Sequence, residues 1–429
     1  MHILYITPYT PNRIRVRSFE FLRALVARGH QVTLGALWAT DEEKRDLDAL
    51  RDLGIGVTAR PLRRLQTLAN SLAALAGPAP LQAHYAWHPG LAAALAEIVH
   101  TQPLGALHVI HVEHLRGARY GLYLAKRMAG QGQAIPIVWD SVDCISHLFR
   151  QAAQQSSSRA SRLLTAFELR RTAPYERFLL GQFDHTLVTS PVDRAALLAL
   201  WGDPGQGHAA PQVAAPQIDV LPNGVDLAYF CPTEEERLPS TLVLSGKMSY
   251  HANVTAARWL VCAIMPRVWR TRPEVDVWIV GKDPPPSVRA LAEERSPGSG
   301  RVLVTGTVPD IRPYLRRATL AVVPVPYGAG IQTKVLEAMA CAAPVVASPQ
   351  AVSALSTTDG QEAIVAGDAA GFAQAIVRLL DAPAERRRLA QAGRAYVEQH
   401  HAWASCAARL EAVYQERLAE KEGSPIVRV

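Results

Sequence analysis

Short apolar runs alternate with amphipathic stretches along most of this chain, a pattern typical of alternating strands and helices. Residues 2–7 (HILYIT) form an apolar run, residues 17–28 carry apolar positions at helical spacing, and residues 31–37 form the next run. Further runs of strand length lie at residues 107–113, 135–139, 183–189, 241–245, 275–281, 302–311 and 320–325. Strands that alternate with helices predict an α/β fold with doubly wound parallel sheets, in which ligands bind at the carboxyl ends of the strands.

The length of 429 residues suits two domains better than a single core. Residues 206–217, rich in proline, glycine and alanine, are the clearest linker. We therefore predict a Rossmann-like N-terminal domain over residues 1–205, a second Rossmann-like domain over 218–402, and a C-terminal helix within 403–429.

The composition, 49% hydrophobic and 19% charged, is that of a globular protein. The five cysteines are scattered, without the paired spacing of a metal site, which fits a reducing compartment. The sequence enters a strand directly at residue 2, and it has no apolar run long enough to span a bilayer. We therefore expect a cytoplasmic protein.

Residues 327–348 (YGAGIQTKVLEAMACAAPVVAS) form the most informative stretch, and their pattern predicts a loop, a helix and a strand. Gly328 and Gly330 allow the backbone of the loop to approach a ligand closely. Lys334 and Glu337 share one face of the helix, whose N-terminus favours an anion. A phosphate near the lysine and a ribose near the carboxylate would fit this arrangement, and a solvated Lys–Glu pair fits it as well.

The pattern GxGIQxKVLEAMAxxxPVVAS resembles the nucleotide-sugar loop of the retaining glycosyltransferases of family 4, and most closely that of the transferases associated with exopolysaccharide biosynthesis. Similar motifs occur in family order at residues 222–226 (PNGVD), 245–260 and 305–310 (TGTVPD). The resemblance implies the GT-B architecture, two Rossmann-like domains that face each other across a cleft. It also implies that the C-terminal helix packs back on the first domain.

The resemblance further implies an enzyme that moves a sugar from a UDP- or GDP-sugar to a glycan or a polyprenyl-linked acceptor. It implies retention of the anomeric configuration, with no metal and no cofactor besides the nucleotide sugar. Lys247 and Lys334 would neutralise the diphosphate during catalysis, and Glu337 would hold the ribose. The other donor-binding positions are Gly328, Gly330, Ile331, Gln332, Gly246, Gly281 and Val308. Many members carry a second acid where this chain has Ala329.

Polar side chains also follow two predicted strands of the N-terminal domain. His111 and Asp140 are candidate catalytic residues, and Asp140 occupies a place where the family commonly has a histidine that contacts the donor sugar. Asp143, Arg13 and Arg15 are candidates for the acceptor side. Taken singly, carboxylates and imidazoles in such places are more often helix caps or satisfied core residues, and the arginines are equally compatible with a solvated basic helix start.

The formal net charge of +7 lies wholly within residues 1–200, which carry 22 basic and 15 acidic side chains. Residues 60–76 combine arginines at one end with a leucine stripe, formed by Leu65, Leu68, Leu72 and Leu75. Such a helix either lies on an anionic membrane surface or turns its stripe to the core. The first alternative suits the resemblance, because related transferases use lipid-linked acceptors at the inner membrane face.

Two other functions fit parts of these observations. A nucleotide-sugar epimerase has the same two-domain architecture and needs no acceptor. A non-enzymatic protein that binds anionic polymers would use the basic first half, and its binding would depend steeply on salt. The aromatic residues are not interleaved with the basic ones, so nucleic acid is not an expected partner.

Overall fold

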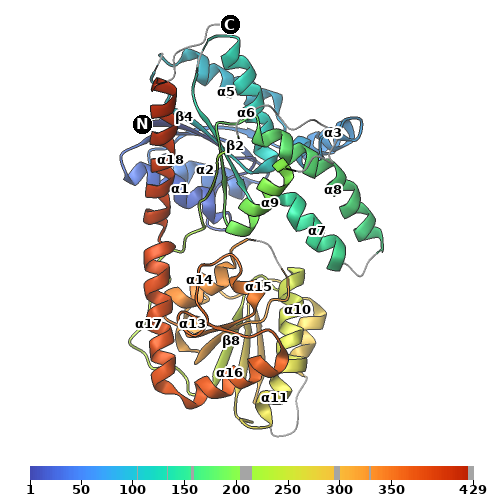
Figure 1. The fold of residues 1–429 in the computed structure, drawn as a ribbon, viewed down its shortest axis with the longest axis vertical. Coiled ribbons are helices and arrows are strands. Elements are labelled where there is room, and N and C mark those ends of the chain that lie inside the picture. The colour runs from blue at the N-terminus through green and yellow to red at the C-terminus, as the bar shows by residue number, and fades with distance from the viewer. Residues whose placement is uncertain are drawn as a thin grey trace. The chain divides into compact units, whose positions relative to one another are not determined.

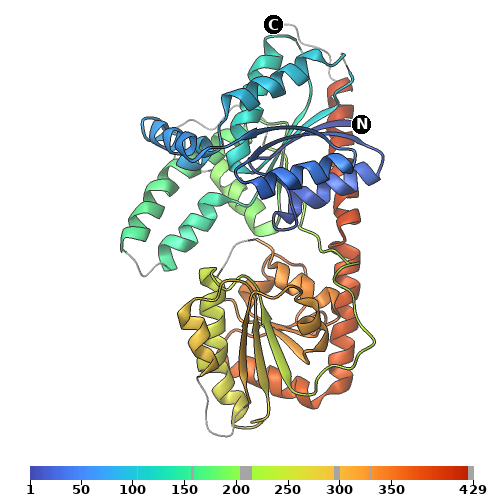
Figure 2. The same ribbon diagram turned by 180° about the vertical axis from the view of Figure 1, so that it is seen from behind.

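The structure is a computed structural model and describes residues 1–103, 105–132, 134–155, 159–202, 215–293, 300–327 and 330–423. Contacts divide the chain into two compact units, unit 1 (Met1–Pro222 with Cys406–Val429) and unit 2 (Asn223–Ser405). Figures 1 and 2 show, from opposite sides, that each unit has a sheet covered by helices. Most of the predicted linker, residues 206–217, lies outside the described residues.

Unit 1 contains a seven-stranded sheet in which every pairing is parallel, in the order β3-β2-β1-β4-β5-β6-β7. Its strands are β1 (His2–Ile6), β2 (Gln31–Trp38), β3 (Gly56–Pro61), β4 (Val109–Glu113), β5 (Ile137–Val142), β6 (His185–Val188) and β7 (Ile218–Val220). Strands β1, β4 and β6 are buried along their whole length, as their near-continuous apolar sequences predict for a parallel sheet with both faces covered.

The helices of unit 1 are α1 (Val16–Ala27), α2 (Asp41–Asp52), α3 (Arg64–Leu75), α4 (Leu81–Tyr85), α5 (Pro89–Thr101), α6 (His114–Ala129), α7 (Ile145–Gln155), α8 (Arg159–Leu180) and α9 (Pro191–Gly202). The last helix of the chain, α18 (Trp403–Gly423), begins in unit 2 and continues into unit 1. Side chains cap several of these helices. Thr40, for example, accepts a hydrogen bond from the Glu43 amide at the start of α2.

Unit 2 contains a six-stranded parallel sheet in the order β10-β9-β8-β11-β12-β13. Its strands are β8 (Thr241–Ser245), β9 (Asp276–Val280), β10 (Val302–Gly306), β11 (Leu320–Val323), β12 (Val345–Ala347) and β13 (Ile364–Val365). Its helices are α10 (His251–Trp259), α11 (Met265–Trp269), α12 (Pro286–Arg289), α13 (Arg312–Arg317), α14 (Thr333–Ala340), α15 (Pro349–Val352), α16 (Ala369–Asp381) and α17 (Pro383–His400), with a π-helical turn at Leu260–Ile264 and a 3-10 turn at Ala290–Ala292.

Each sheet reverses its strand order once, between β1 and β4 in unit 1 and between β8 and β11 in unit 2. At such a reversal the connections leave the sheet toward opposite faces, so a crevice opens beyond the carboxyl ends of the two central strands. The residues just after β8 and β11 therefore occupy the position at which doubly wound sheets bind nucleotides. They include the glycine–lysine pair after β8 and the loop before α14.

The predicted α/β class with doubly wound sheets is confirmed. Several elements were missing from the sequence-based interpretation, among them β3, α5 and α7. Strand β3 lies at the edge of its sheet, and its residues are mostly half-buried, so it lacks the continuous apolar signal of the central strands. Its last residues, Arg60 and Pro61, were predicted to belong to the following helix, which begins at Arg64.

Within the described residues, none of the helices combines the length and the apolar character that crossing a bilayer requires.

Candidate functional site

Two glycines lie in contact at the carboxyl ends of β8 and β9. Gly246 has a φ of 140° and Gly281 a φ of 151°, backbone conformations that side chains rarely adopt. A Cβ atom at Gly281 would lie 1.7 Å from the Gly246 carbonyl oxygen, a distance that no rearrangement of a side chain could relieve. The two backbone segments thus approach as closely as glycine permits. Backbone atoms, and not side chains, therefore occupy this part of the predicted nucleotide crevice.

Lys334, in the first turn of α14, extends toward this pair of glycines. A Cβ atom at Gly246 would lie 3.2 Å from Lys334 Cε, and Lys334 Nζ donates a hydrogen bond to Gln332 Oε1 over 3.0 Å. The side chain is only 8% exposed, and burial lowers the pKa of its ammonium group to about 8, although the Glu337 carboxylate opposes this shift. A buried ammonium group that lacks a carboxylate partner within ion-pair distance favours the binding of an anion.

Glu337 lies one turn further along α14 and keeps partial exposure to solvent. The surrounding protein nevertheless raises its pKa to about 7 by desolvation, and only the charge of Lys334 counteracts this effect. Among the described residues, none forms a hydrogen bond with the Glu337 carboxylate. The Glu337 side chain is thus neither sealed in the core nor fully exposed.

Lys247 and Asn253 complete the surroundings of Gly246. The Lys247 side chain is exposed, and its carbonyl oxygen accepts a hydrogen bond from Asn253 Nδ2 over 2.9 Å. Asn253 is 4% exposed, and its Oδ1 atom has no hydrogen-bond partner in the part of the chain that the structure describes. Nearby, the Tyr327 hydroxyl is within 3.0 Å of Thr255 Oγ1 and also contacts the His251 ring. The contacts of Tyr327 connect the first turns of α10 to the loop before α14.

The remaining predicted donor positions lie in the loop before α14 and in the loop after β10. Gly330 has a φ of 67°, Ile331 is 8% exposed, and Gln332 is the residue before the first turn of α14. Gly328, like Ala329, lies outside the described residues. Val308, in the loop after β10, packs partly buried against the core of unit 2.

The loop that contains Val308 is fixed by a stacked group that the sequence did not reveal. The Arg312 guanidinium lies 3.9 Å from the centre of the Tyr229 ring and forms an ion pair of 2.7 Å with Asp310. Asp310 is part of the TGTVPD motif, whereas Tyr229 follows the PNGVD motif far away in the sequence. A cation–π contact between distant segments leaves no local pattern, so only the structure could identify it.

In unit 1 a second polar group lies beneath the carboxyl ends of β1, β4 and β5. Arg17 forms an ion pair with Asp140 at 2.8 Å, and His111 Nε2 lies 3.7 Å from the same Asp140 oxygen. Tyr414, on α18, shares a hydrogen bond of 2.9 Å with His111 Nδ1. Glu113 accepts hydrogen bonds from Tyr5, over 2.8 Å, and from Tyr9.

This group is buried, and burial dominates its titration. His111, Glu113 and Asp140 have no exposed surface. Desolvation lowers the pKa of His111 to about 4 and raises that of Glu113 to about 7, with the Asp140 charge adding to the second shift. His111 is thus neutral near pH 7. The predicted candidates His111 and Asp140 are brought together by the fold, but through contacts with Arg17 and Tyr414 and without a surface open to a substrate.

The three predicted acceptor-side residues differ in their surroundings. Asp143 accepts a hydrogen bond from Thr189 over 3.2 Å, and burial with the nearby Asp193 charge raises its pKa to about 6. Arg15 pairs with Glu43 at 2.9 Å, and Arg13 is exposed. Asp143 is therefore half-buried beside Thr189, and the arginines form a basic, largely solvated start to α1.

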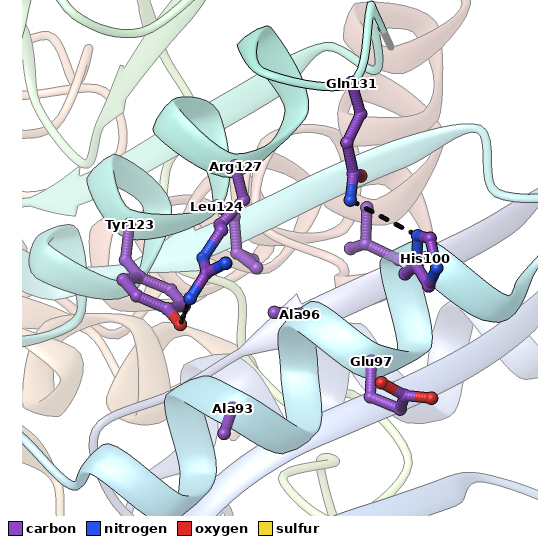
Figure 3. A pocket seen from close by; sticks show the side chains of 9 residues that line it. Ala93, Ala96, Glu97, His100, Tyr123, Leu124, Arg127 and Gln131 are labelled. Carbon is purple, nitrogen blue, oxygen red and sulfur yellow. Dashed lines mark hydrogen bonds between the residues drawn. The ribbon is translucent and has the colours of Figure 1, made fainter.

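One further hollow lies between α5 and α6, encloses about 240 Å³, and is lined by Glu97, His100, Tyr123, Arg127 and Gln131 among others. Figure 3 shows Arg127 directed to Tyr123 along α6, and Gln131 directed across the hollow to His100 on α5. It shares no residue with either polar group described above. Among the described residues, no set of three histidine, cysteine, aspartate or glutamate side chains is arranged to hold a metal ion.

Comparison with known proteins identifies the second unit. Residues 239–382 match the family described as Glycosyl transferases group 1. This segment is therefore a glycosyltransferase domain, and it includes β8, β9 and α14 with the glycines and charged residues described above.

The chain is also similar to two curated mannosyltransferases. The GDP-mannose-dependent monoacylated alpha-(1-6)-phosphatidylinositol monomannoside mannosyltransferase of Corynebacterium glutamicum is 28% identical over 216 residues, which are 47% of this chain and 56% of that protein. The MMP alpha-(1->4)-mannosyltransferase of Mycolicibacterium hassiacum is 30% identical over 215 residues, 48% of this chain and 50% of that protein. The chain thus spans about half the length of the curated relatives it matches.

Solved structures match nearly the whole chain and establish the fold. Sucrose-phosphate synthase from Thermosynechococcus elongatus superimposes with a TM-score of 0.60 at 18% identity, over 98% of this chain and all of that one. HepE from Anabaena, solved in complex with UDP and glucose, gives a TM-score of 0.60 at 13% identity, over 97% of this chain and all of that one. The two sheets therefore have the GT-B fold of glycosyltransferases.

Proposed function

We propose that this protein transfers a sugar from a nucleotide sugar to a glycan or lipid-linked acceptor, with retention of configuration, in the synthesis of an exopolysaccharide or another cell-surface glycan. The observation that carries the proposal is the arrangement after β8 and β11, where Lys334 lies against Gly246 and Glu337 follows one turn later. A glycosyltransferase family match covers this part of the chain.

The donor side follows from the chemistry of these residues. Lys247 and Lys334 would hold the diphosphate, together with backbone amides from residues 330–332, and Glu337 would accept hydrogen bonds from the ribose hydroxyls. Backbone groups near Val308 would contact the nucleobase. Two cations suffice to neutralise a diphosphate leaving group, so the proposal includes no metal. The relatives support UDP or GDP as the nucleotide, since HepE was solved with UDP-glucose and the corynebacterial relative is named as GDP-mannose-dependent.

In the proposed reaction the bond between the anomeric carbon and the diphosphate oxygen breaks, and both electrons of that bond leave with the phosphate. The acceptor hydroxyl forms the new bond on the same face of the sugar, and its proton passes to the departing phosphate. The lysines act by stabilising the negative charge that develops on the leaving oxygen. Atoms and charge balance without a protein nucleophile.

Residues 1–205 are proposed as the acceptor domain and residues 218–402 as the donor domain. Arg13, Arg15 and Asp143 remain candidates for the acceptor side. His111 and Asp140 are completely buried, which favours a role in positioning Tyr414 and Arg17 over direct contact with the acceptor. The basic surface of the first half and the lipid-linked acceptors of related enzymes support a place at the inner face of the cytoplasmic membrane.

The donor proposal is tested by a thermal-shift series with UDP-, GDP- and ADP-sugars, because a ligand that binds only the native state raises its melting temperature. Lys247→Ala and Glu337→Ala should each reduce turnover by a factor of about 100 or more, since each removes a charged contact to the donor. Arg258→Ala and Glu235→Ala, at exposed positions of the same unit, are matched controls that should retain wild-type turnover.

The rival functions give different results in the same assays. A nucleotide-sugar epimerase would convert its substrate without any acceptor, and the family match does not favour it. A polymer-binding protein would show no nucleotide-dependent shift. Wild-type turnover in either Lys247→Ala or Glu337→Ala would remove the proposed donor site.

A further inference from the structure

Helix α3 is oriented with its polar side toward the protein and its apolar side outward. In the ordinary arrangement a surface helix buries its apolar stripe. Here Gln66 donates a hydrogen bond to the Trp87 carbonyl oxygen over 3.3 Å, and Asn70 donates one to the same oxygen over 2.8 Å. Among the residues of α3, only Ala74 is buried. The hydrogen-bonding side chains therefore attach the helix to the segment around α4.

The opposite face of α3 consists of the leucine stripe. Leu65 is 80% exposed, Leu68 57%, Leu72 58% and Leu75 54%. The 3-4-3 spacing of these positions places all four on one face, which we call the leucine face. Figures 1 and 2 agree in placing α3 at the outer margin of unit 1. Isolated exposed leucines are common, but a continuous stripe of four on a helix that buries polar groups marks an interaction surface.

The leucine face belongs to a segment of uniformly positive charge. Between Asp52 and Glu97 the sequence contains three arginines, Arg60, Arg63 and Arg64, and no acidic residue. Arg63 and Arg64 are exposed at the N-terminus of α3, where the helix dipole disfavours a cation, and the first turn contains no acidic side chain. The two arginines therefore do not stabilise the helix. They place two positive charges, available to bind an anion, next to the leucine face.

An aromatic side chain lies near the other end of the helix. Arg171, on α8, donates to the carbonyl oxygens of Ala74 and Gly77, and so holds the C-terminal end of α3. Its guanidinium lies 5.2 Å from the centre of the Phe167 ring, which is 45% exposed. Leucines and phenylalanine together with arginines are the composition of helices that lie in the interface of an anionic bilayer.

We propose that the leucine face of α3 inserts into the surface of an anionic lipid bilayer, with Arg63 and Arg64 at the lipid headgroups. The inference deepens the membrane association proposed above and specifies the surface that makes it, but it does not depend on sugar transfer. A second copy of the chain is a poorer occupant, because pairing two such faces would bring their arginines toward each other, and residues 53–96 contain no acidic side chain to compensate this charge.

The test is flotation of the full-length protein with vesicles of phosphatidylcholine that contain phosphatidylglycerol, compared with vesicles of phosphatidylcholine alone. Wild-type protein should float with the first and not with the second. Arg63→Gln/Arg64→Gln should weaken binding about fivefold for each arginine removed, which corresponds to about 1 kcal/mol per charge. Leu68→Gln/Leu72→Gln should weaken it about tenfold or more, since two side chains no longer leave water.

The matched control is Leu53→Gln/Leu303→Gln, which replaces two exposed leucines outside α3. It should float like the wild type. Glutamine has nearly the helix propensity of leucine, so the α3 variant should keep the wild-type melting temperature. A second measurement does not rely on loss of binding: Leu68→Trp should be quenched by brominated lipids more strongly than the wild-type protein.

Three results would overturn the proposal. The first is vesicle binding by the Leu68→Gln/Leu72→Gln variant equal to that of the wild type. The second is quenching of Leu68→Trp no stronger than that of the wild type. The third is a wild-type protein that does not float but forms a dimer, which the Leu68→Gln/Leu72→Gln substitutions dissociate. The last result would assign the leucine face to a second copy. Sugar transfer in the absence of vesicles distinguishes a failure of this inference from a failure of the proposed enzyme activity.

Discussion

Lys334 lies against Gly246, so the start of α14 and the end of β8 form one site although they are distant in sequence. A Cβ atom at Gly246 would lie 3.2 Å from Lys334 Cε and 2.9 Å from Asn253 Nδ2. Any side chain at position 246 would therefore displace the lysine, the asparagine or both. This contact connects the candidate diphosphate site to the strand that precedes it.

Gly246→Ala should lower the affinity for nucleoside diphosphates by about tenfold or more, because it moves the Lys334 ammonium group and strains a backbone at a φ of 140°. Calorimetric titration measures this loss. Gly360→Ala is the control for backbone strain alone, since Gly360 has a φ of 79° and open space around its Cβ position. Equal affinities of the two variants would show that the contact with Lys334 is irrelevant to binding.

The affinity for nucleoside diphosphates should follow a bell-shaped pH profile. Ribose hydroxyls donate to an ionised carboxylate, so binding should strengthen as pH rises through the Glu337 pKa of about 7. A protonated ammonium holds phosphate, so binding should weaken as pH rises through the Lys334 pKa of about 8. The maximum is expected between these values. Glu337→Gln should flatten the acid limb and shift the alkaline limb to lower pH, because the Glu337 charge raises the Lys334 pKa; an unchanged acid limb would contradict the ribose contact.

Ionisation of the buried Glu113 carboxyl group should destabilise the folded protein as pH rises. Burial raises its folded-state pKa to about 7, above the ordinary value of 4.5, so between these values the folded state binds more protons than the unfolded state. The free energy of unfolding contributed by Glu113 therefore falls as pH increases across that window. Glu113→Gln, which keeps an acceptor for Tyr5, should stabilise the protein above pH 7 and have little effect below pH 4.5. Thermal melting at both extremes measures the difference, and an equal effect at both would refute the assigned titration.

Arg17→Met should destabilise unit 1 by about 3–5 kcal/mol, because it leaves the fully buried Asp140 carboxylate without its cation. The control is Arg15→Met, which breaks the more exposed pair with Glu43 and should cost about 0–1 kcal/mol. Denaturant melting monitored for each unit separately compares the two. A similar loss of unfolding free energy in both variants would show that the buried Arg17–Asp140 pair contributes no more to stability than the exposed Arg15–Glu43 pair.

Much of the fold was predictable because parallel strands buried on both faces have continuous apolar sequences. The prediction for β8, residues 241–245, coincides with the observed strand, and α14 begins at Thr333 within the predicted loop–helix–strand stretch. Edge strand β3 was missed because its residues are half-buried and its sequence mixes polar and apolar positions. The sequence also left open whether the leucine stripe of α3 faces the core, and the structure turns it outward.

Parts of the candidate site were predictable for a different reason. Lys334 and Glu337 are neighbours on one helix, so their spacing alone places them together. Tyr414 and His111 are far apart in sequence, and their hydrogen bond depends on where α18 packs within unit 1. The burial of Asp140 likewise depends on Arg17 from another element. Such relationships are set by tertiary packing and have no local signal.

A nucleotide held after β8 and β11 is the central element of the proposed function, and a crystal structure with bound UDP or GDP tests it directly. We predict that the ribose hydroxyls lie within hydrogen-bond distance of the Glu337 carboxylate and that the diphosphate lies between Lys247 and Lys334. A nucleotide bound elsewhere on the chain, or bound here with its ribose directed away from Glu337, would contradict the assigned site.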